Sequence, residues 1–263
     1  MKIGFLVQSQ EDFEKWALFA DAAGIPGIEI DYMGKTPYEF DADSTNKAFA
    51  HKQVKPCAVS IWHINTIAKD PDERKKTDDI IHRFLKYTAD IGSPVAFMNT
   101  GEYEENNTDR NLEEFSKQHA RYNKMAKDMG LSLSYYLGHK GNFVNSKEIL
   151  DKVTSAIPDM MLKLDPVGLE RNSKADPYEI ISIYGGKVNH FHCKDIIRYK
   201  NKFEIEPPVG LGDIAWNKII GMLYHYGYDG YLVIEPHGAM WNKPENKAGH
   251  ITLSKKHLEQ FIF

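Results

Sequence analysis

The hydrophobic pattern of the chain alternates between two spacings. Short apolar runs are typical of buried strands, while longer stretches carry apolar residues three and four positions apart, like Phe13, Trp16 and Ala20 on one helical face. The pattern predicts strands over 2–7, 27–31, 57–62, 95–99, 131–137, 161–165, 187–193 and 230–235. It predicts helices over 11–23, 44–52, 71–91, 109–129, 146–156, 176–184, 213–226 and 252–261.

Strands that alternate with helices imply a parallel sheet, because each parallel pair needs a crossover connection. Eight such units over about 250 residues fit a TIM barrel. We therefore predict an α/β fold, a (β/α)8 barrel formed by residues 1–263 as a single domain. An open doubly wound sheet would bring a glycine-rich phosphate-binding turn after the first strand, and the segment VQSQED contains no glycine there.

Composition narrows the class of protein. The 263 residues are 42% hydrophobic, and 33 Lys and Arg against 37 Asp and Glu give a net charge of −4, which does not favour a nucleic-acid partner. Cys57 and Cys193 lie too far apart in sequence to suggest a disulfide framework. The sequence shows neither a signal-like segment nor a membrane-spanning run. We expect a cytoplasmic protein whose partner is a small molecule; the sequence leaves homo-oligomer formation open.

Polar residues gather where the predicted strands end, and this is the end of a TIM barrel that carries the active site. The strand bodies are apolar, so the polarity lies at one end. In chain order, the strand ends supply Gln8; Glu29 and Asp31; Trp62, His63 and Asn65; Asn99 and Gly101; Tyr136 and His139; Asp165; His192, Lys194 and Asp195; and Glu235 and His237.

The alternation of side chains between the two faces of a strand makes this pattern more specific on the segment VNHFHCKD, residues 188–195. His192 shares a strand face with Lys194, so it points into the barrel mouth when Phe191 faces the helices. Asp165 and Glu235 end the neighbouring strands, and the three together predict a site for a divalent metal: Mn²⁺, Mg²⁺, Co²⁺ or Zn²⁺. Taken singly, a strand-end acid is more often a cap. Lys194 fits a substrate-binding cation and half of an ion pair equally well.

Three runs resemble the sugar phosphate isomerase/epimerase family of xylose isomerase-like TIM barrels: LKLDPVGL, DPYEIISIYGGKVNHFHCKD and PPVGLGDIAWNKIIGMLYHYGYDGYLVIEPH. The resemblance implies a metal-dependent isomerase, epimerase or dehydratase that acts on a sugar, keto-sugar or polyol through an enediolate. It implies Asp165, His192 and Glu235 as metal ligands. The further expected site residues are Glu235 as base, Lys194 and His63 as catalytic groups, and Trp62, Asn99, His139 and His237 as substrate contacts.

The sequence departs from the family pattern on strand five, where a fourth ligand, a glutamate, is usual. If His139 matches the histidine that follows this glutamate, Leu137 takes its place; another register puts Tyr135 or Tyr136 there. No carboxylate results in either register. One alternative is therefore a degenerate barrel that binds a carbohydrate or a partner without turnover. A second is a DNA repair enzyme like endonuclease IV, against which Asn99, Gly168 and the net charge argue.

Overall fold

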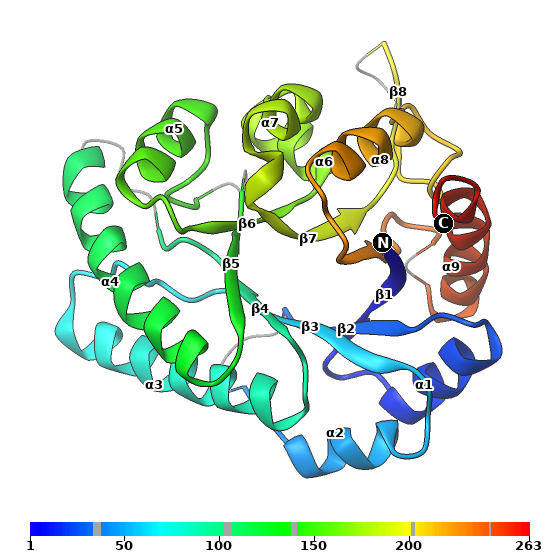
Figure 1. The fold of residues 1–263 in the computed structure, drawn as a ribbon, viewed down its shortest axis with the longest axis horizontal. Coiled ribbons are helices and arrows are strands. Elements are labelled where there is room, and N and C mark those ends of the chain that lie inside the picture. The colour runs from blue at the N-terminus through cyan, green and yellow to red at the C-terminus, as the bar shows by residue number, and fades with distance from the viewer. Residues whose placement is uncertain (34–37, 103–106, 138–140, 201–202, 242) are drawn as a thin grey trace.

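The computed structural model describes the chain apart from residues 34–37, 103–106, 138–140, 201–202 and 242. In this described part, eight parallel strands close into a barrel in the order β1-β10-β7-β6-β5-β4-β3-β2 (Figure 1). The predicted (β/α)8 barrel is confirmed. The barrel strands are β1 Lys2–Gln8, β2 Gly27–Tyr32, β3 Lys55–Ile61, β4 Val95–Met98, β5 Ser132–Tyr136, β6 Met161–Leu164, β7 Val188–Cys193 and β10 Tyr231–Ile234.

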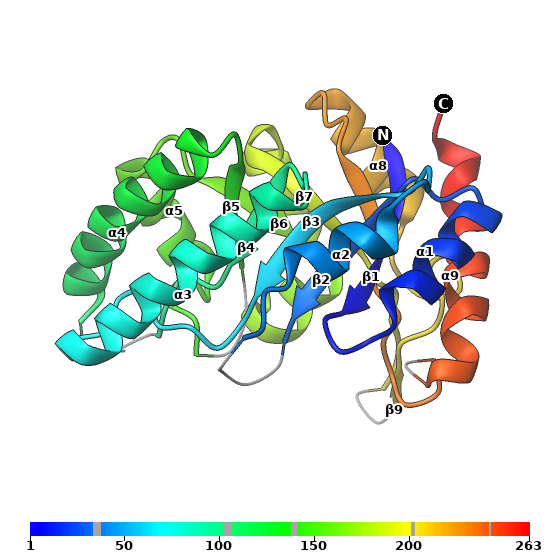
Figure 2. The same ribbon diagram turned by 90° about the horizontal axis from the view of Figure 1, so that it is seen from below.

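The helices form a ring outside the barrel (Figures 1 and 2). Asp12, Asp41, Asp70, Ser146 and Asp176 cap five of them, each accepting a hydrogen bond from a backbone N–H of the first turn. The helices are α1 Phe13–Ala22, α2 Ala42–Phe49, α3 Pro71–Asp90, α4 Thr108–Asp128, α5 Lys147–Ala156, α6 Pro166–Gly168, α7 Pro177–Tyr184, α8 Trp216–His225 and α9 Pro244–Leu258. A π-turn, Leu169–Ser173, and two 3-10 turns, Gly185–Lys187 and Glu259–Phe261, complete them.

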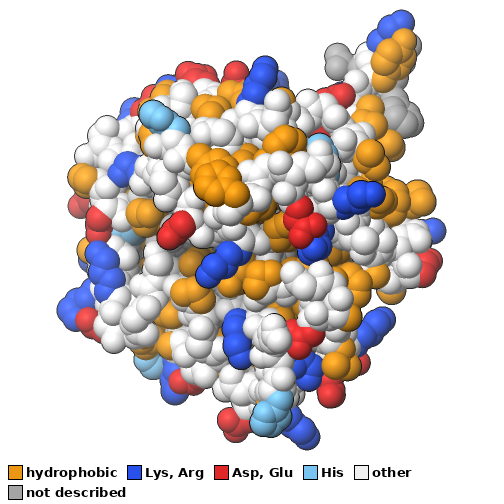
Figure 3. All heavy atoms as spheres, turned by 45° about the vertical axis from the view of Figure 1, so that its right-hand side comes forward, with side chains coloured by type: hydrophobic (Ala, Val, Ile, Leu, Met, Phe, Trp, Pro, Cys, Tyr) orange, Lys and Arg blue, Asp and Glu red, His pale blue; other side chains and the backbone are white. Residues whose placement is uncertain are grey.

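Besides shifts of a few residues and the short helices within 166–173 and 185–187, two elements differ from the prediction. The last helix begins at Pro244, not at 252, because the proline occupies its first turn, where no backbone N–H is needed. The polar segment 198–208 contains most of an antiparallel hairpin, β8 Ile197–Tyr199 with β9 Phe203–Ile205, which projects from the molecule (Figures 1 and 3). Tyr199 and Ile205 are exposed on this hairpin, so its strands lacked the apolar signal of a buried strand.

The barrel strands bury both faces. On β7, Phe191 faces the helices and packs edge-to-face on Trp216 of α8, with 6.3 Å between ring centroids. The opposite face of β7 carries His190 and His192 into the barrel. The barrel interior is apolar at one level, where Leu6, Cys57 and Val233 pack together, and polar toward the carboxyl ends of the strands. This polarity forms the candidate site.

Candidate active site

A cavity of about 650 Å³ opens at the carboxyl ends of the strands. Its lining comes from β3, β4, β5, β6, β7 and β10 and the loops that follow them, which is where catalysis occurs in TIM barrels. The lining includes Trp62, His63, Asn99, Tyr136, Lys163, Asp165, Lys194, Glu235 and His237. Apart from Lys163, every residue in this list stands at a strand end that the sequence analysis picked out.

Asp165 and Glu235, which line this cavity, come together with the buried His192. One ligand atom from each lies within 4.8 Å of the others, and all three side chains are buried. They follow or end the adjacent strands β6, β7 and β10, as the sequence predicts. One imidazole and two carboxylates form a donor set that suits Mn²⁺, Mg²⁺, Co²⁺ or Zn²⁺.

Asp165 both caps a helix and belongs to the candidate metal site. Its Oδ1 accepts a hydrogen bond of 3.0 Å from Gly168 N and so caps α6. Its Oδ2 is buried and lies 2.6 Å from Lys194 Nζ and 3.8 Å from Lys163 Nζ, so this oxygen already faces cationic groups. With His192 and Glu235 beside it, Asp165 completes a set of one nitrogen and two carboxylate donors that fits a divalent metal.

His192 is held between two carboxylates. Its Nδ1 lies 2.6 Å from Glu235 Oε2 and its Nε2 lies 2.8 Å from Glu29 Oε2. Glu29 Oε2 also lies 2.6 Å from His190 Nε2. Burial raises the pKa of Glu29, but the charges of both histidines and their hydrogen bonds outweigh it and bring the pKa to about 2. Glu29 is therefore an ionised carboxylate that fixes the orientation of a candidate metal ligand.

Lys194 is half of an ion pair, one of the two roles that the sequence left open. Its Nζ lies 2.6 Å from Asp165 Oδ2 and 3.1 Å from Glu235 Oε2. Burial lowers the pKa of Lys194, but these two carboxylates raise it more. Burial raises the pKa values of Asp165 and Glu235, but the charges of Lys194 and His192 lower them more. Both candidate ligands are thus ionised, as metal binding requires.

Lys163 of β6 is a site residue that the sequence reasoning missed. It shares the inward face of β6 with Asp165, and its Nζ lies 3.8 Å from Asp165 Oδ2. The rings of Phe97 and Tyr136 flank the ammonium group, with centroids 5.8 and 5.9 Å away. The sequence contained a signal for this residue: Lys163 interrupts the apolar run MLKL and stands two positions before Asp165, so both side chains lie on the same face of the strand.

Strand five supplies a tyrosine to the cavity. Tyr136 faces inward, and its ring centroid lies 4.1 Å from that of Trp62. Leu137 points the other way and packs near Leu150 of α5 and Leu169. The register that places Tyr136 at the site is therefore the observed one, and β5 brings no carboxylate. His139 lies outside the described residues.

The other predicted contacts lie around the rim of the cavity. Trp62 Nε1 donates a 2.6 Å hydrogen bond to Asp31 Oδ1, and Asn99 Nδ2 donates to Ile64 O. His63 is exposed at the rim and adopts a left-handed φ of 57°. His237 pairs with Glu206, and its Nε2 lies 4.0 Å from Glu235 Oε1.

Asp195, also singled out at the end of strand seven, holds the following segment in place. Its carboxylate accepts hydrogen bonds from Ile196 N, Gly210 N and Ile214 N and from the indole of Trp216. Asp195 is buried beneath the loop that leads into α8 and does not line the cavity. Its role is to anchor that loop.

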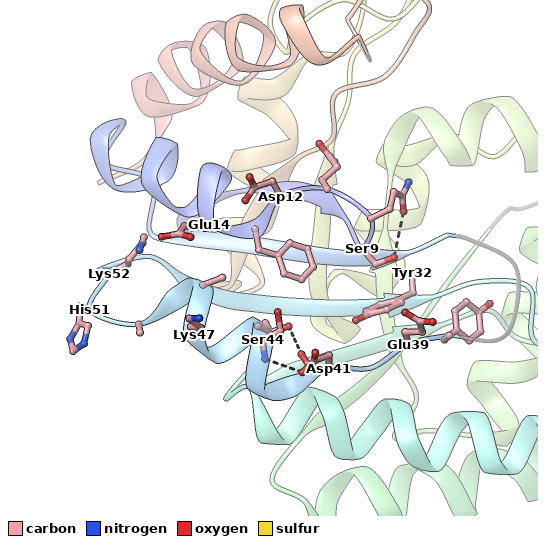
Figure 4. A pocket seen from close by; sticks show the side chains of 17 residues that line it. Ser9, Asp12, Glu14, Tyr32, Glu39, Asp41, Ser44, Lys47, His51 and Lys52 are labelled. Atoms are coloured by element: carbon pink, nitrogen blue, oxygen red, sulfur yellow. Dashed lines mark hydrogen bonds between the residues drawn. The ribbon is translucent and has the colours of Figure 1, made fainter.

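A second hollow lies outside the barrel, between α1 and α2 (Figure 4). Its acidic residues include Asp12 and Asp41, which cap these helices through Lys15 N and Ser44 N. Among the described residues, the two groups that could hold a metal are Asp165 with His192 and Glu235, and Glu29 with His190 and His192; neither lies in this hollow. The charged side chains of this hollow are accounted for by helix capping and solvation.

Comparison with known proteins agrees with the geometry. Residues 17–255 match the family model described as xylose isomerase-like TIM barrel. An inosose dehydratase of Clostridium botulinum (strain Alaska E43 / Type E3) is 24% identical over 269 residues, which cover 89% of this chain and 87% of that protein. The D-psicose 3-epimerase of Clostridium cellulolyticum H10 superposes with a TM-score of 0.79 at 15% identity, over 99% of each chain.

The IolI protein, whose structure contains a zinc atom, superposes with a TM-score of 0.75 at 16% identity, over 100% of this chain and 99% of that one. In the described part of the chain, no helix has the length and apolarity needed to cross a bilayer. Since the family model covers most of the sequence, this chain belongs to the xylose isomerase-like TIM barrel family.

Proposed function

We propose that the chain is a metal-dependent enzyme that removes water from a keto-sugar or keto-polyol. The observation that carries the proposal is the joint position of Asp165, His192 and Glu235: their ligand atoms lie within 4.8 Å of one another, and the two carboxylates line an open cavity. The dehydratases among its relatives support the reaction type, since they align over most of the chain.

Asp165, His192 and Glu235 would hold the metal, and the zinc atom in IolI supports this assignment. When bound there, a divalent metal would polarise a substrate carbonyl and so make the neighbouring C–H group more acidic. Glu29 keeps the imidazole of His192 oriented through the bond to Nε2. The donor set leaves the choice among Mn²⁺, Mg²⁺, Co²⁺ and Zn²⁺ to measurement.

Glu235 is the base in this proposal. Its Oε2 is occupied by His192 and Lys194, so Oε1 is the oxygen that takes a proton from the carbon next to the substrate carbonyl. The departing hydroxide needs a proton, for which Lys194 and His63 are the candidate donors. Trp62 and Tyr136 form an aromatic wall against which the C–H face of a sugar ring packs.

Elimination suits this site better than epimerisation by two carboxylates. An epimerase that works with two bases needs a proton acceptor on each side of the substrate carbon, and β5 supplies Tyr136 where a second carboxylate would be required. Burial raises the pKa of the Tyr136 hydroxyl well above its usual range, which makes it a poor base. One-base ketol isomerisation is the second candidate reaction, supported by the same single carboxylate.

The first test is the metal content of the purified protein beside an Asp165→Ala/His192→Ala double variant. We expect near-stoichiometric metal in the wild type and loss of the metal in the variant, measured by plasma mass spectrometry. The metal-loaded enzyme is then assayed on a keto-inositol by the absorbance of the conjugated product, and on ketohexoses by chromatography. Glu235→Gln should abolish turnover while the fold is retained, because it removes the base.

Other outcomes favour the alternatives. A wild type that stays empty after incubation with Mn²⁺, Zn²⁺ and Co²⁺ would leave a binding barrel without metal chemistry. Strand cleavage at an abasic site in DNA would instead support the repair enzyme. Full turnover by Glu235→Gln would remove Glu235 as the base.

A further inference from the structure

Lys163 is a buried cation at the wall of the cavity. It is 1% exposed, yet it lines the cavity beside Tyr136 and Asp165. Phe97 and Tyr136 enclose the side chain from β4 and β5. An ammonium group buried among aromatic rings is costly unless a partner compensates it.

The described part of the protein compensates this charge through nearby carboxylates and not through a close hydrogen bond. In the part of the chain that the structure describes, Lys163 Nζ donates no hydrogen bond, and its ion-pair contact is Asp165 Oδ2 at 3.8 Å. That oxygen already lies 2.6 Å from Lys194 Nζ. The contrast between the two lysines is clear: Lys194 is held by two carboxylates, and Lys163 has N–H groups left to donate.

A molecule that enters the cavity can supply a hydrogen-bond acceptor to Lys163, because this lysine lines the cavity. Near β4 and β5 the cavity wall carries the neutral Asn99 and Tyr136 and the carboxylate of Glu102, and Lys163 supplies an ammonium group to this wall. Glu235 lines the same cavity from β10. The arrangement places a carboxylate base and a hydrogen-bond-donating cation in one chamber, which suits a substrate that gains negative charge on oxygen.

We propose that Lys163 is a further catalytic residue, whose ammonium group donates a hydrogen bond to the substrate oxygen that becomes negative during turnover. This inference rests on the proposed function. Glu235 takes a proton from the carbon next to the carbonyl, the C–H electron pair forms a carbon–carbon double bond, and the carbonyl electron pair moves to oxygen. Lys163 keeps its protons throughout and stabilises that oxygen.

The test uses binding, so that it does not depend on knowing the natural substrate. A four-carbon sugar hydroxamate serves as the anionic mimic of an enediolate, and myo-inositol serves as the neutral polyol. Dissociation constants for both are measured by calorimetry on the Mn²⁺-loaded wild type and on Lys163→Met, which keeps the length of the side chain and removes its charge. Manganese content and the circular dichroism spectrum of each variant are recorded beside them.

We expect Lys163→Met to bind the hydroxamate about 100-fold more weakly, which is the lower end of the effect of removing one donor to a developing oxyanion. Its affinity for myo-inositol and its manganese content should stay at the wild-type level. Lys163→Arg should recover most of the hydroxamate binding, because it restores the charge. Lys163→Gln replaces Lys163→Met if the methionine variant does not fold.

Lys247→Met is the matched control. Lys247 is also buried, pairs with Glu11 Oε1 at 2.5 Å and does not line the cavity. Removing this lysine should leave the affinity for both probes unchanged.

The outcomes separate the two proposals. Equal loss of both probes in Lys163→Met, or loss of neither, overturns the role of Lys163 while the proposed function stands. A metal-loaded wild type that binds neither probe overturns the proposed function, and the role of Lys163 with it.

Discussion

Glu29 lies inside the barrel and is fully buried, with one oxygen shared by His190 and His192. It contacts neither the cavity nor the solvent. Its effect on the candidate metal centre is therefore exerted through the orientation of His192. A carboxylate behind a ligating histidine commonly sets both the tautomer and the angle of the ring.

Glu29→Gln should weaken metal binding about 10- to 100-fold, because the amide no longer accepts hydrogen bonds from both imidazoles as an ion does. A competition titration with a chromophoric chelator measures this affinity. Glu14→Gln, on the exposed face of α1, is the control and should bind metal like the wild type. Equal affinity in Glu29→Gln and the wild type would show that His192 needs no such support.

Asp31 is a second buried carboxylate, and its pKa moves in the opposite direction. Burial raises it from the usual 3.8 to about 7, against the hydrogen bonds that Ser60 and Trp62 donate. The folded state therefore holds a proton on Asp31 that the unfolded state has already lost above about pH 4. The protonated Asp31 therefore stabilises the folded state at low pH, and this stabilisation is lost as the pH rises to about 7.

Asp31→Asn should remove this pH dependence and keep an acceptor for both donors. Between pH 5 and pH 8, the free energy of unfolding of the wild type should fall relative to that of the variant, by on the order of a few kcal/mol. Urea denaturation at both pH values measures the difference. Parallel curves for the two proteins would show that Asp31 ionises normally.

At the scale of elements, the loop between β9 and α8 depends on the carboxylate of Asp195. Gly212 lies directly against it: a Cβ at this position would stand 2.1 Å from Asp195 Oδ1 and 2.7 Å from Ile196 O. The backbone has to approach this closely for Ile214 N and Gly210 N to reach the carboxylate. Position 212 therefore has no room for a side chain, and only glycine fits there.

Gly212→Ala should therefore lower the free energy of unfolding by about 2–4 kcal/mol, since it disrupts a buried hydrogen-bonded group. Gly221→Ala is the matched control. It lies within α8 with no atom inside 4 Å of the new Cβ, so it should raise stability by about 0.5–1 kcal/mol. Thermal or urea unfolding of both variants checks the contrast, and a neutral Gly212→Ala would contradict the anchoring role.

The elements also show what the sequence could predict. Regular alternation and polar strand ends predicted all eight barrel strands and the group formed by Asp165, His192 and Glu235. Tyr136 was harder, because a shift of one residue sends a strand side chain to the opposite face, and only packing against α5 fixes Leu137 outward. Lys163 was missed because MLKL has the composition of a buried strand. The hairpin at 197–205 was missed because its residues are exposed.

At the scale of the whole molecule, barrel closure brings together groups far apart in the sequence. His192 and Glu29 are separated by 163 positions, and their bond crosses the barrel interior. Metal bound at the mouth would add to the stability of this folded state alone, since the ligands are dispersed in the unfolded chain.

Mn²⁺ at 100 times its dissociation constant should raise the free energy of unfolding by about 2.7 kcal/mol. The melting temperature, followed by circular dichroism with and without EDTA, should rise in the wild type. It should not change in Asp165→Ala/His192→Ala. An equal rise in both proteins would place the metal elsewhere.

Barrel closure depends on the pairing of the first strand, β1, with the last, β10. During synthesis, the growing chain therefore carries two unpaired sheet edges until the residues of β10 have left the ribosome. Glu235, the residue after that strand, emerges after the other barrel strands, so the charges of Glu29, His192 and Lys194 have no complete set of partners before then. The candidate active site is consequently assembled only once β10 has emerged, and exposed edges before that point make the nascent chain prone to wrong pairing.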